Sequence, residues 1–331
     1  MSAGFTGIDV TVPKDKYLEI LGFTIYTYLA GRITAYSGIM GGKRSLGEYI
    51  ENFIYGKVAE VALQTFLVKE YGLETLTDLD IADFVLGEYL PDIIAFRRDE
   101  EYEQAHFWVE VKEVRRDQKW LLIPASAVRS RPYDAYVAVW VGLPDEHIAW
   151  LVKYVPQVEK VMGEGWKKRL AELEEIITNI PCKVIGFVPW GDVELVIRAK
   201  EKTLEAGRAL DAKYGQKAWH YFSGNEKLYD PSNPSWKGSQ VKENVGFFLG
   251  GLARSSDWSA FIDLMLRNQR LVEKVPIERK SRRDVPDICK ALSSDDFREL
   301  FEKCLEHQLR NIKSRYRSIK RDTSWFQQPL R

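Results

Sequence analysis

Two acidic residues and one lysine stand where short apolar runs of the chain begin and end. Asp92 follows Pro91 at the start of one strand-like run, and Glu110 and Lys112 lie in the next one. Alternate residues of a strand point to the same face, so Glu110 and Lys112 are expected to project together. Val111 between them then turns into the core. The polar connection between the two runs is of hairpin type, which predicts that Asp92 lies beside them.

Two carboxylates and an ammonium group at one sheet edge are suited to metal-assisted hydrolysis of phosphodiesters. A hard divalent cation such as Mg²⁺ takes oxygen ligands, which carboxylates, a backbone carbonyl and water molecules supply. Such a cation polarises a phosphate and lowers the pKa of a bound water. A lysine nearby orients that water and offsets the charge that develops on the phosphate. The residues therefore predict a Mg²⁺ site at this edge.

The short motifs are common in so charged a chain, and their context is what selects one combination. Triplets of an acidic residue, any residue and lysine also begin at Asp117, in a polar stretch, and at Asp211, in a helical pattern. The combination of Asp92, Glu110 and Lys112 joins two neighbouring apolar runs. The alternative is an ordinary cross-strand ion pair on a solvated face, which contributes about 0.2–1 kcal/mol. The motifs alone leave both interpretations open.

A long helix is predicted over residues 48–70, with apolar residues on nearly every side, which indicates a buried helix. Glu60 lies in its middle, where a carboxylate is costly unless it is paired or binds a metal. Gly56, one turn earlier, lowers helix stability by about 1 kcal/mol relative to alanine and would leave room for another backbone to approach. We expect Glu60 to support the Asp92 centre. The alternative is that Glu60 faces solvent beside Lys57.

Three elements in this order resemble the PD-(D/E)XK nuclease superfamily, most closely its type II restriction endonucleases: a helix bearing Glu60, a strand starting at Pro91-Asp92, and a strand bearing Glu110-Val111-Lys112. The resemblance covers residues 48–150 and agrees with the family's α-β-β-β-α-β core. It implies that Mg²⁺ is held by Asp92, Glu110 and the carbonyl of Val111. It also implies that Lys112 positions the attacking water and that Glu60 supports the site.

The resemblance further implies in-line hydrolysis of double-stranded DNA that leaves 5′-phosphate and 3′-hydroxyl ends. Because two strands must be cut and one chain carries one site, a homodimer is expected. A cognate DNA methyltransferase is the expected partner in the same restriction-modification system. Two alternatives remain open: a DNA repair or junction-resolving nuclease of the same fold, and a non-enzymatic DNA-binding protein in which the motif is accidental.

The order of elements predicts an α/β fold with a mixed β-sheet flanked by helices, a restriction-endonuclease-like core. Strands are expected at 82–86, 92–96, 107–111, 135–143, 147–154 and 183–188, and helices at 120–128 and 159–177. The strand at 147–154 is expected to pair with that at 135–143. Residues 1–200 are predicted to form the nuclease core with an N-terminal helical extension. Residues 201–331 are predicted to form a mainly helical, basic region for DNA binding or dimerisation, with a loop at 223–240.

The charge distribution is uneven along the chain, which can mark a DNA-facing C-terminal region and can also arise by chance. Residues 201–331 carry 25 Lys and Arg against 18 Asp and Glu, a balance of +7, whereas the whole chain is neutral. Each basic residue has a plain solvated surface position as its alternative. Candidate DNA contacts follow the predicted catalytic strand, precede the buried strand or lie near the C-terminus: Arg115, Arg116, Lys119, Arg129, Arg131, Arg315 and Arg317.

Other function classes find no support in the sequence. No apolar run approaches the roughly 18 residues that a membrane span requires. The N-terminal residues lack the pattern of a signal peptide, so a cytoplasmic location is expected. The cysteines form no C-x-x-C pair, which argues against zinc and iron–sulfur sites. No G-x-x-x-x-G-K-[ST] motif is present, so ATP-driven translocation is not expected.

Overall fold

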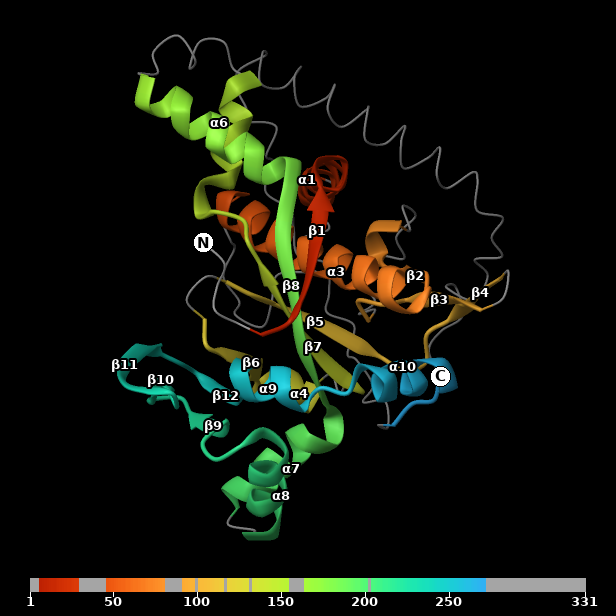
Figure 1. The fold of residues 1–331 in the computed structure, drawn as a ribbon, viewed down its shortest axis with the longest axis vertical. Coiled ribbons are helices and arrows are strands. Elements are labelled where there is room, and N and C mark those ends of the chain that lie inside the picture. The colour runs from red at the N-terminus through yellow and green to blue at the C-terminus, as the bar shows by residue number, and fades with distance from the viewer. Residues whose placement is uncertain are drawn as a thin grey trace.

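The computed structural model describes residues 6–29, 46–80, 91–98, 101–115, 118–130, 133–154, 164–201 and 204–271. At its centre is a four-stranded sheet in the order β1-β8-β7-β5 (Figure 1). These strands are β1 (Ile8–Pro13), β8 (Asn179–Pro189), β7 (Ala135–Val141) and β5 (Val109–Val114). β5 runs parallel to β7, and the other pairs are antiparallel. The predicted α/β fold with a mixed sheet flanked by helices is confirmed at this level.

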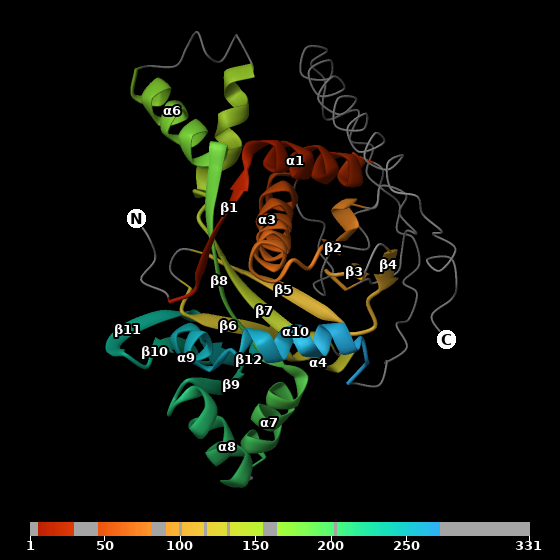
Figure 2. The ribbon, with the colours of Figure 1, turned by 45° about the vertical axis from the view of Figure 1, so that its right-hand side comes forward.

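Two helices cover one face of this sheet (Figure 2). α3 (Leu46–Tyr71) packs on the sheet, and α1 (Lys14–Leu29) packs against α3. Val58 and Ala62 of α3 share one buried cluster with Val111 of β5. Burial of this apolar helix face provides most of the driving force for docking, at about 25 cal/mol per Å² of apolar area. The long helix predicted at 48–70 is confirmed.

The opposite face of the sheet is covered by a second sheet and by further helices. The second sheet has the order β6-β12-β9 and consists of β6 (Trp120–Pro124), β12 (Glu243–Phe248) and β9 (Trp219–Ser223). The helices on this side are α4 (Ala125–Ser130), α7 (Trp190–Lys200), α8 (Leu204–Tyr214) and α9 (Leu249–Ser255). A second buried cluster joins these elements to Tyr136 and Ala138 of β7.

The remaining elements lie around this centre. A small antiparallel sheet is formed by β2 (Thr75–Leu76), β3 (Ala95–Arg98) and β4 (Glu101–Gln104). A separate hairpin is formed by β10 (Lys227–Asp230) and β11 (Asn233–Gln240). The other helical elements are η1 (Asp78–Asp80), η2 (Asp145–Tyr154), α6 (Glu164–Thr178) and α10 (Trp258–Arg267). None of the helices in the described ranges is long and apolar enough to cross a membrane.

The residues that follow α10 bind back to the start of β5. Asn268 adopts a left-handed conformation with φ 50°, and its Oδ1 accepts a hydrogen bond of 2.6 Å from the backbone of His106. Asp134, fully buried, accepts hydrogen bonds of 2.6 Å from the backbone of Trp108 and from Arg270 Nη1. A buried carboxylate requires such partners, because an unpaired charge in the interior is strongly destabilising. α10 is thereby tied to the strand that carries the candidate site.

Three predictions in the first part of the chain need correction. β3 pairs with β4 and not with the strand that carries Glu110. Residues 147–154 are not a strand: they belong to the 3₁₀ helix η2, and the antiparallel partner of β7 is β8. The helix predicted at 120–128 begins as strand β6 and becomes the helix α4 only after Pro124.

The C-terminal region also differs from its prediction. The predicted loop at 223–240 contains the strands β10 and β11, and residues 204–271 form the helix α8, four consecutive strands and the helices α9 and α10. Strands and helices therefore occur together in the described residues 204–271, whereas a mainly helical region was predicted for 201–331. β12 pairs with β6, so backbone hydrogen bonds cross the boundary placed at residue 200. The strand expected at 82–86 and residues 272–331 lie outside the described residues.

Candidate active site

Asp92 lies at the outer edge of β5, the edge strand of the four-stranded sheet. Its backbone N–H donates to the carbonyl of Val109 at 3.1 Å, and its Oδ2 accepts from the backbone N–H of Val111 at 2.6 Å. In an extended strand the N–H and the C=O of one residue point to the same edge. The carbonyl of Val111 is therefore directed to the edge where Asp92 lies, as the expected metal site requires.

Glu110 and Lys112 project together from β5, as the alternation of a strand predicts. Lys112 Nζ donates a hydrogen bond of 2.5 Å to Glu110 Oε1. Their side chains are 18% and 26% exposed, so the pair is reachable from solvent. Val111 is 7% exposed and packs in the cluster under α3, whereas Trp108 and Val114 belong to the cluster on the other face. The ion pair thus lies on the face of the sheet opposite α3.

The pKa of Asp92 responds to its burial and to the charged groups around it. Removal from water and the Glu110 carboxylate raise the pKa of Asp92 to about 8, while Lys57, the Val111 N–H and Lys112 act in the opposite direction. Burial acts to lower the pKa of Lys112, but the Glu110 carboxylate outweighs it and the pKa is raised. Two carboxylates that repel one another in this way favour a cation between them.

Glu60 is buried on α3 and is held by Lys57. Lys57 Nζ lies 2.7 Å from Glu60 Oε1 and 2.8 Å from Oε2, and both side chains are 7% exposed. The alternative in which Glu60 faces solvent is therefore wrong, although its pairing with Lys57 is correct. Sequence reasoning treated Lys57 as a helical neighbour only. The sequence does indicate that Lys57 is paired, because burying a lysine in a helix that is apolar on nearly every side is as costly as burying a glutamate.

The oxygen atoms of Asp92 and Glu110 fit a divalent cation. Among the described residues, Asp92 Oδ1 and Glu110 Oε2 accept no hydrogen bond. The described residues contain no group of three or more His, Cys, Asp or Glu side chains able to hold a metal. A site here would combine two carboxylates with the Val111 carbonyl and water. Mg²⁺ is commonly bound in this way, because it keeps several of its waters.

The position of Gly56 suggested that another backbone approaches α3 closely there, but none does among the described residues. A Cβ built at Gly56 meets no other atom within 4 Å. The glycine therefore leaves open space on α3. It has no packing reason among the described residues, which makes it a target for a stabilising substitution.

The predicted DNA contacts are placed only in part. Arg115 contacts α3: Nη1 lies 3.0 Å from Glu51, and Nη2 donates to Asn52 at 2.6 Å. Its guanidinium also lies 4.3 Å from the ring centroid of Tyr55, so it anchors the end of β5. Lys119 Nζ lies 4.0 Å from the carboxylate of Asp230. The side chain of Arg129 and all of Arg116, Arg131, Arg315 and Arg317 lie outside what the structure describes.

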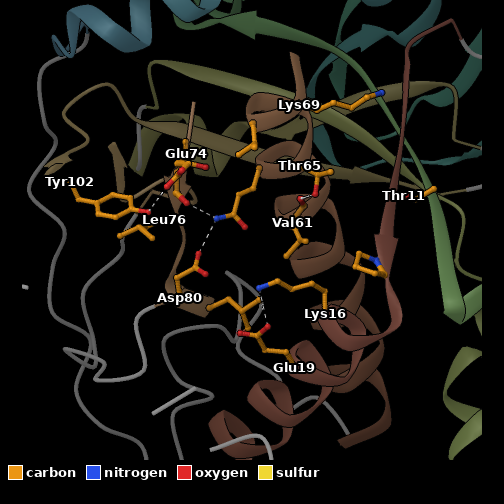
Figure 3. A pocket seen from close by; sticks show the side chains of 15 residues that line it. Thr11, Lys16, Glu19, Val61, Thr65, Lys69, Glu74, Leu76, Asp80 and Tyr102 are labelled. Carbon is orange, nitrogen blue, oxygen red and sulfur yellow. Dashed lines mark hydrogen bonds and ion pairs between the residues drawn. The ribbon is translucent and has the colours of Figure 1, made fainter. Parts of the chain in front are cut away.

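A pocket of about 840 Å³ opens beside α3, between α1, β1, β2 and β4 (Figure 3). Each of its acidic side chains has a neighbouring donor. Asp80 accepts from Gln64 at 2.9 Å, and Glu74 accepts from the hydroxyl of Tyr102 at 3.2 Å. Lys16 and Glu19 pair at 2.9 Å. The lysines that line the pocket lie on the helices α1 and α3, so no lysine shares a sheet edge with two carboxylates there. The pocket is therefore a weaker candidate for the catalytic centre than the site at Asp92.

Comparison with protein-family models, with curated proteins and with solved structures finds no match to this chain. The assignment of the site therefore depends on its own residues and their geometry.

Proposed function

We propose that this chain is a Mg²⁺-dependent endonuclease that hydrolyses double-stranded DNA, of the PD-(D/E)XK type and most like a type II restriction enzyme. The single observation that carries the proposal is the Asp92 carboxylate, which is held at the edge of β5 by the N–H of Val111, the residue between Glu110 and Lys112. The order α3, β2, β3, β5, α4, β7 also supports it, because it contains the α-β-β-β-α-β sequence of that superfamily with β4 and β6 inserted.

Each residue of the centre then has a separate task. Asp92, Glu110 and the carbonyl of Val111 would hold Mg²⁺, and the Val111 N–H fixes the orientation of the Asp92 carboxylate. When bound, the cation polarises the phosphodiester and makes a coordinated water more acidic. Lys112, already directed at Glu110, orients the attacking water and offsets negative charge on the phosphate. The Lys57–Glu60 pair supports the α3 side of the centre.

The oligomeric state and the partners belong to the same proposal. Cutting both strands of a duplex with one centre per chain requires two chains, so we propose a homodimer on double-stranded DNA. A DNA methyltransferase of the same specificity is the proposed companion, since a restriction enzyme needs its host sites protected.

Cleavage of plasmid DNA by the full chain in Mg²⁺ and in EDTA tests the proposal. Asp92→Asn and Lys112→Ala are each expected to reduce cleavage by about 10²–10³-fold or more, because each removes a charge-stabilising group. The matched controls are Asp263→Asn, an exposed carboxylate on α10, and Lys69→Ala, whose side chain is 62% exposed. Both controls should cut like the wild type.

The products of the same digest separate the outcomes. Discrete fragments support a sequence-specific restriction enzyme. Cleavage confined to branched or damaged substrates supports a repair or junction-resolving nuclease. An Asp92→Asn variant that cuts at the wild-type rate, or full cleavage in EDTA, refutes the proposed centre.

A further inference from the structure

Tyr136 lies directly beside Glu110 in the four-stranded sheet. β7 runs parallel to β5 there, and the Cα atoms of Glu110 and Tyr136 are partners in the register (Figure 1). Neighbouring strands are about 4.8 Å apart, so side chains at partnered positions on one face are neighbours. Tyr136 and Ala138 belong to the buried cluster on the face opposite α3, as Trp108 and Val114 of β5 do. Glu110 and Tyr136 therefore project from the same face of the sheet.

The hydroxyl of Tyr136 has no hydrogen-bond partner among the described residues, although the residue is only 1% exposed. A buried hydroxyl without a partner is costly, because it has given up its hydrogen bonds to water. Burial and the Glu110 carboxylate raise the pKa of Tyr136, while the Tyr133 backbone acts in the opposite direction. The uncharged hydroxyl is therefore favoured, which keeps a hydrogen-bond donor beside Glu110.

Glu110 has an oxygen that lacks a donor. Lys112 Nζ engages Glu110 Oε1 at 2.5 Å, and Glu110 Oε2 accepts no hydrogen bond among the described residues. The partner of Lys112 in the register is Ala138, so β7 offers a polar side chain to Glu110 and none to Lys112. A donor without an acceptor and an acceptor without a donor thus lie on neighbouring strands, on one face of the sheet.

We infer that Tyr136 is a positioning residue, which takes over the Glu110 carboxylate from Lys112 during cleavage. The inference rests on the proposed function and adds a residue to its centre. Lys112 donates to Glu110 in the resting centre and turns to the attacking water and the phosphate during the reaction. A change of rotamer at Glu110 then brings its carboxylate to the Tyr136 hydroxyl, which donates a hydrogen bond and keeps Glu110 oriented. No covalent bond is made or broken and no proton is transferred in this exchange.

A double-mutant cycle of thermal melts tests this contact without relying on activity. In the wild-type chain, Tyr136→Phe should leave the melting temperature unchanged or raise it slightly, because it removes a hydroxyl that has no partner. In the Lys112→Met background the same substitution should lower the melting temperature by a few degrees, because there the hydroxyl holds the released carboxylate. This loss should disappear in Lys112→Met/Glu110→Ala, which lacks the acceptor.

Tyr214→Phe is the matched control, because Tyr214 is a buried tyrosine whose hydroxyl already donates to Asp192. It should lower the melting temperature equally with and without Lys112. Steady-state cleavage by the full chain in Mg²⁺ adds a second measurement. Tyr136→Phe should lower kcat about tenfold and leave the KM for DNA unchanged, because Tyr136 acts through Glu110 and does not touch the substrate.

The outcomes separate this inference from the proposed function. A loss of stability in Tyr136→Phe that is the same with and without Lys112 shows a structural role for the hydroxyl and overturns the inference. The absence of any loss in the Lys112→Met background overturns it too, as does an unchanged kcat for Tyr136→Phe in a chain that cuts DNA. The kcat measurement decides the matter if Lys112→Met does not fold. A wild-type chain that cuts no DNA overturns the proposed function, whatever the melts show.

Discussion

The carboxylate of Asp92 is oriented by the main chain of Val111, whose N–H lies 2.6 Å from Oδ2. A glutamate at this position keeps the charge but moves the carboxylate outward by one methylene. Displacements of about 1 Å in a catalytic centre cost about 100-fold in rate. Asp92→Glu is therefore expected to lose at least about that factor in cleavage while folding normally. Initial rates on plasmid DNA, with circular dichroism to verify folding, measure this; a rate within threefold of the wild type contradicts it.

Calcium should support DNA binding by this chain without efficient cleavage. It fits the oxygens of Asp92 and Glu110, but it accepts a larger and looser coordination shell than Mg²⁺. Gel-shift titrations in Ca²⁺, Mg²⁺ and EDTA, with cleavage followed in parallel, measure both properties. Rapid cutting in Ca²⁺, or binding that is identical in Ca²⁺ and EDTA, would show that the carboxylates do not hold the metal as proposed.

His147 should make the protein less stable in mild acid. Burial and the neighbouring Arg115 lower its pKa from 6.5 to about 4, with Asp145 opposing, and its Nδ1 is 2.9 Å from the Tyr17 hydroxyl. The unfolded chain therefore binds the proton more readily between these pH values. The stabilisation is complete above about pH 6.5 and is lost as the pH falls towards 4, by an amount on the order of 3 kcal/mol.

Urea unfolding at pH 7 and pH 4.5 measures this loss in the wild type and in His147→Gln. The variant should show a smaller difference between the two pH values. His106→Gln, an exposed side chain, is the control and should behave like the wild type. Equal pH dependence in wild type and His147→Gln would mean that other groups cause the acid sensitivity.

Gly56→Ala should stabilise the protein by about 0.5–1 kcal/mol, because alanine restricts the unfolded chain and α3 has open space there. Gly72→Ala is the matched comparison variant, and it should destabilise the protein. Gly72 ends α3 at φ 64°, where its N–H bonds to Val68 O and the next N–H bonds to Leu67 O. A side chain in that left-handed conformation costs about 1–2 kcal/mol. Thermal melts should shift in opposite directions, and a lower melting temperature for Gly56→Ala would reveal a contact at that face.

The basic cluster near the C-terminus should contribute affinity for phosphates and little base preference. If Arg315, Arg317 and Arg321 contact DNA, neutralising all three lowers the salt slope of log K by up to roughly 3. Sequence preference should not change, because phosphate contacts carry no base information. Binding measured over a range of salt concentrations tests this. A variant that becomes monomeric with unchanged slope would place the cluster in the dimer contact instead.

Periodicity predicted the long elements of the fold because their burial is one-sided or complete. α3 is apolar on nearly every side and β7 is buried along its whole length, so both signals are strong. The shared face of Glu110 and Lys112 follows from strand alternation in the same way. The effect of Lys57 on the pKa of Asp92 did not follow, since it depends on the rotational phase of α3 against β5, which only tertiary packing fixes.

The elements that were mispredicted have physical reasons. β10 and β11 contain Pro231, Pro234 and Gly238 at or near the strands, together with register shifts, so their pattern resembles a loop. The alternating apolar residues of η2 resemble a strand. Its His147 is instead enclosed by the rings of Tyr17 and Tyr55, at centroid distances of 5.8 Å and 5.5 Å. Such contacts between distant segments leave no trace in a local pattern.

The pairing of β1 with β8 and of β6 with β12 has a consequence for synthesis of the chain. Ile8 pairs with Val184, and Leu121 pairs with Phe247. The contacts that complete both sheets therefore join segments far apart in sequence. Contacts between residues so far apart in sequence form slowly during folding. Asp134 likewise gains Arg270 only near the end of the described chain. A growing polypeptide therefore carries Asp92 and Glu110 long before the strands β8 and β12 that complete the two sheets have been made.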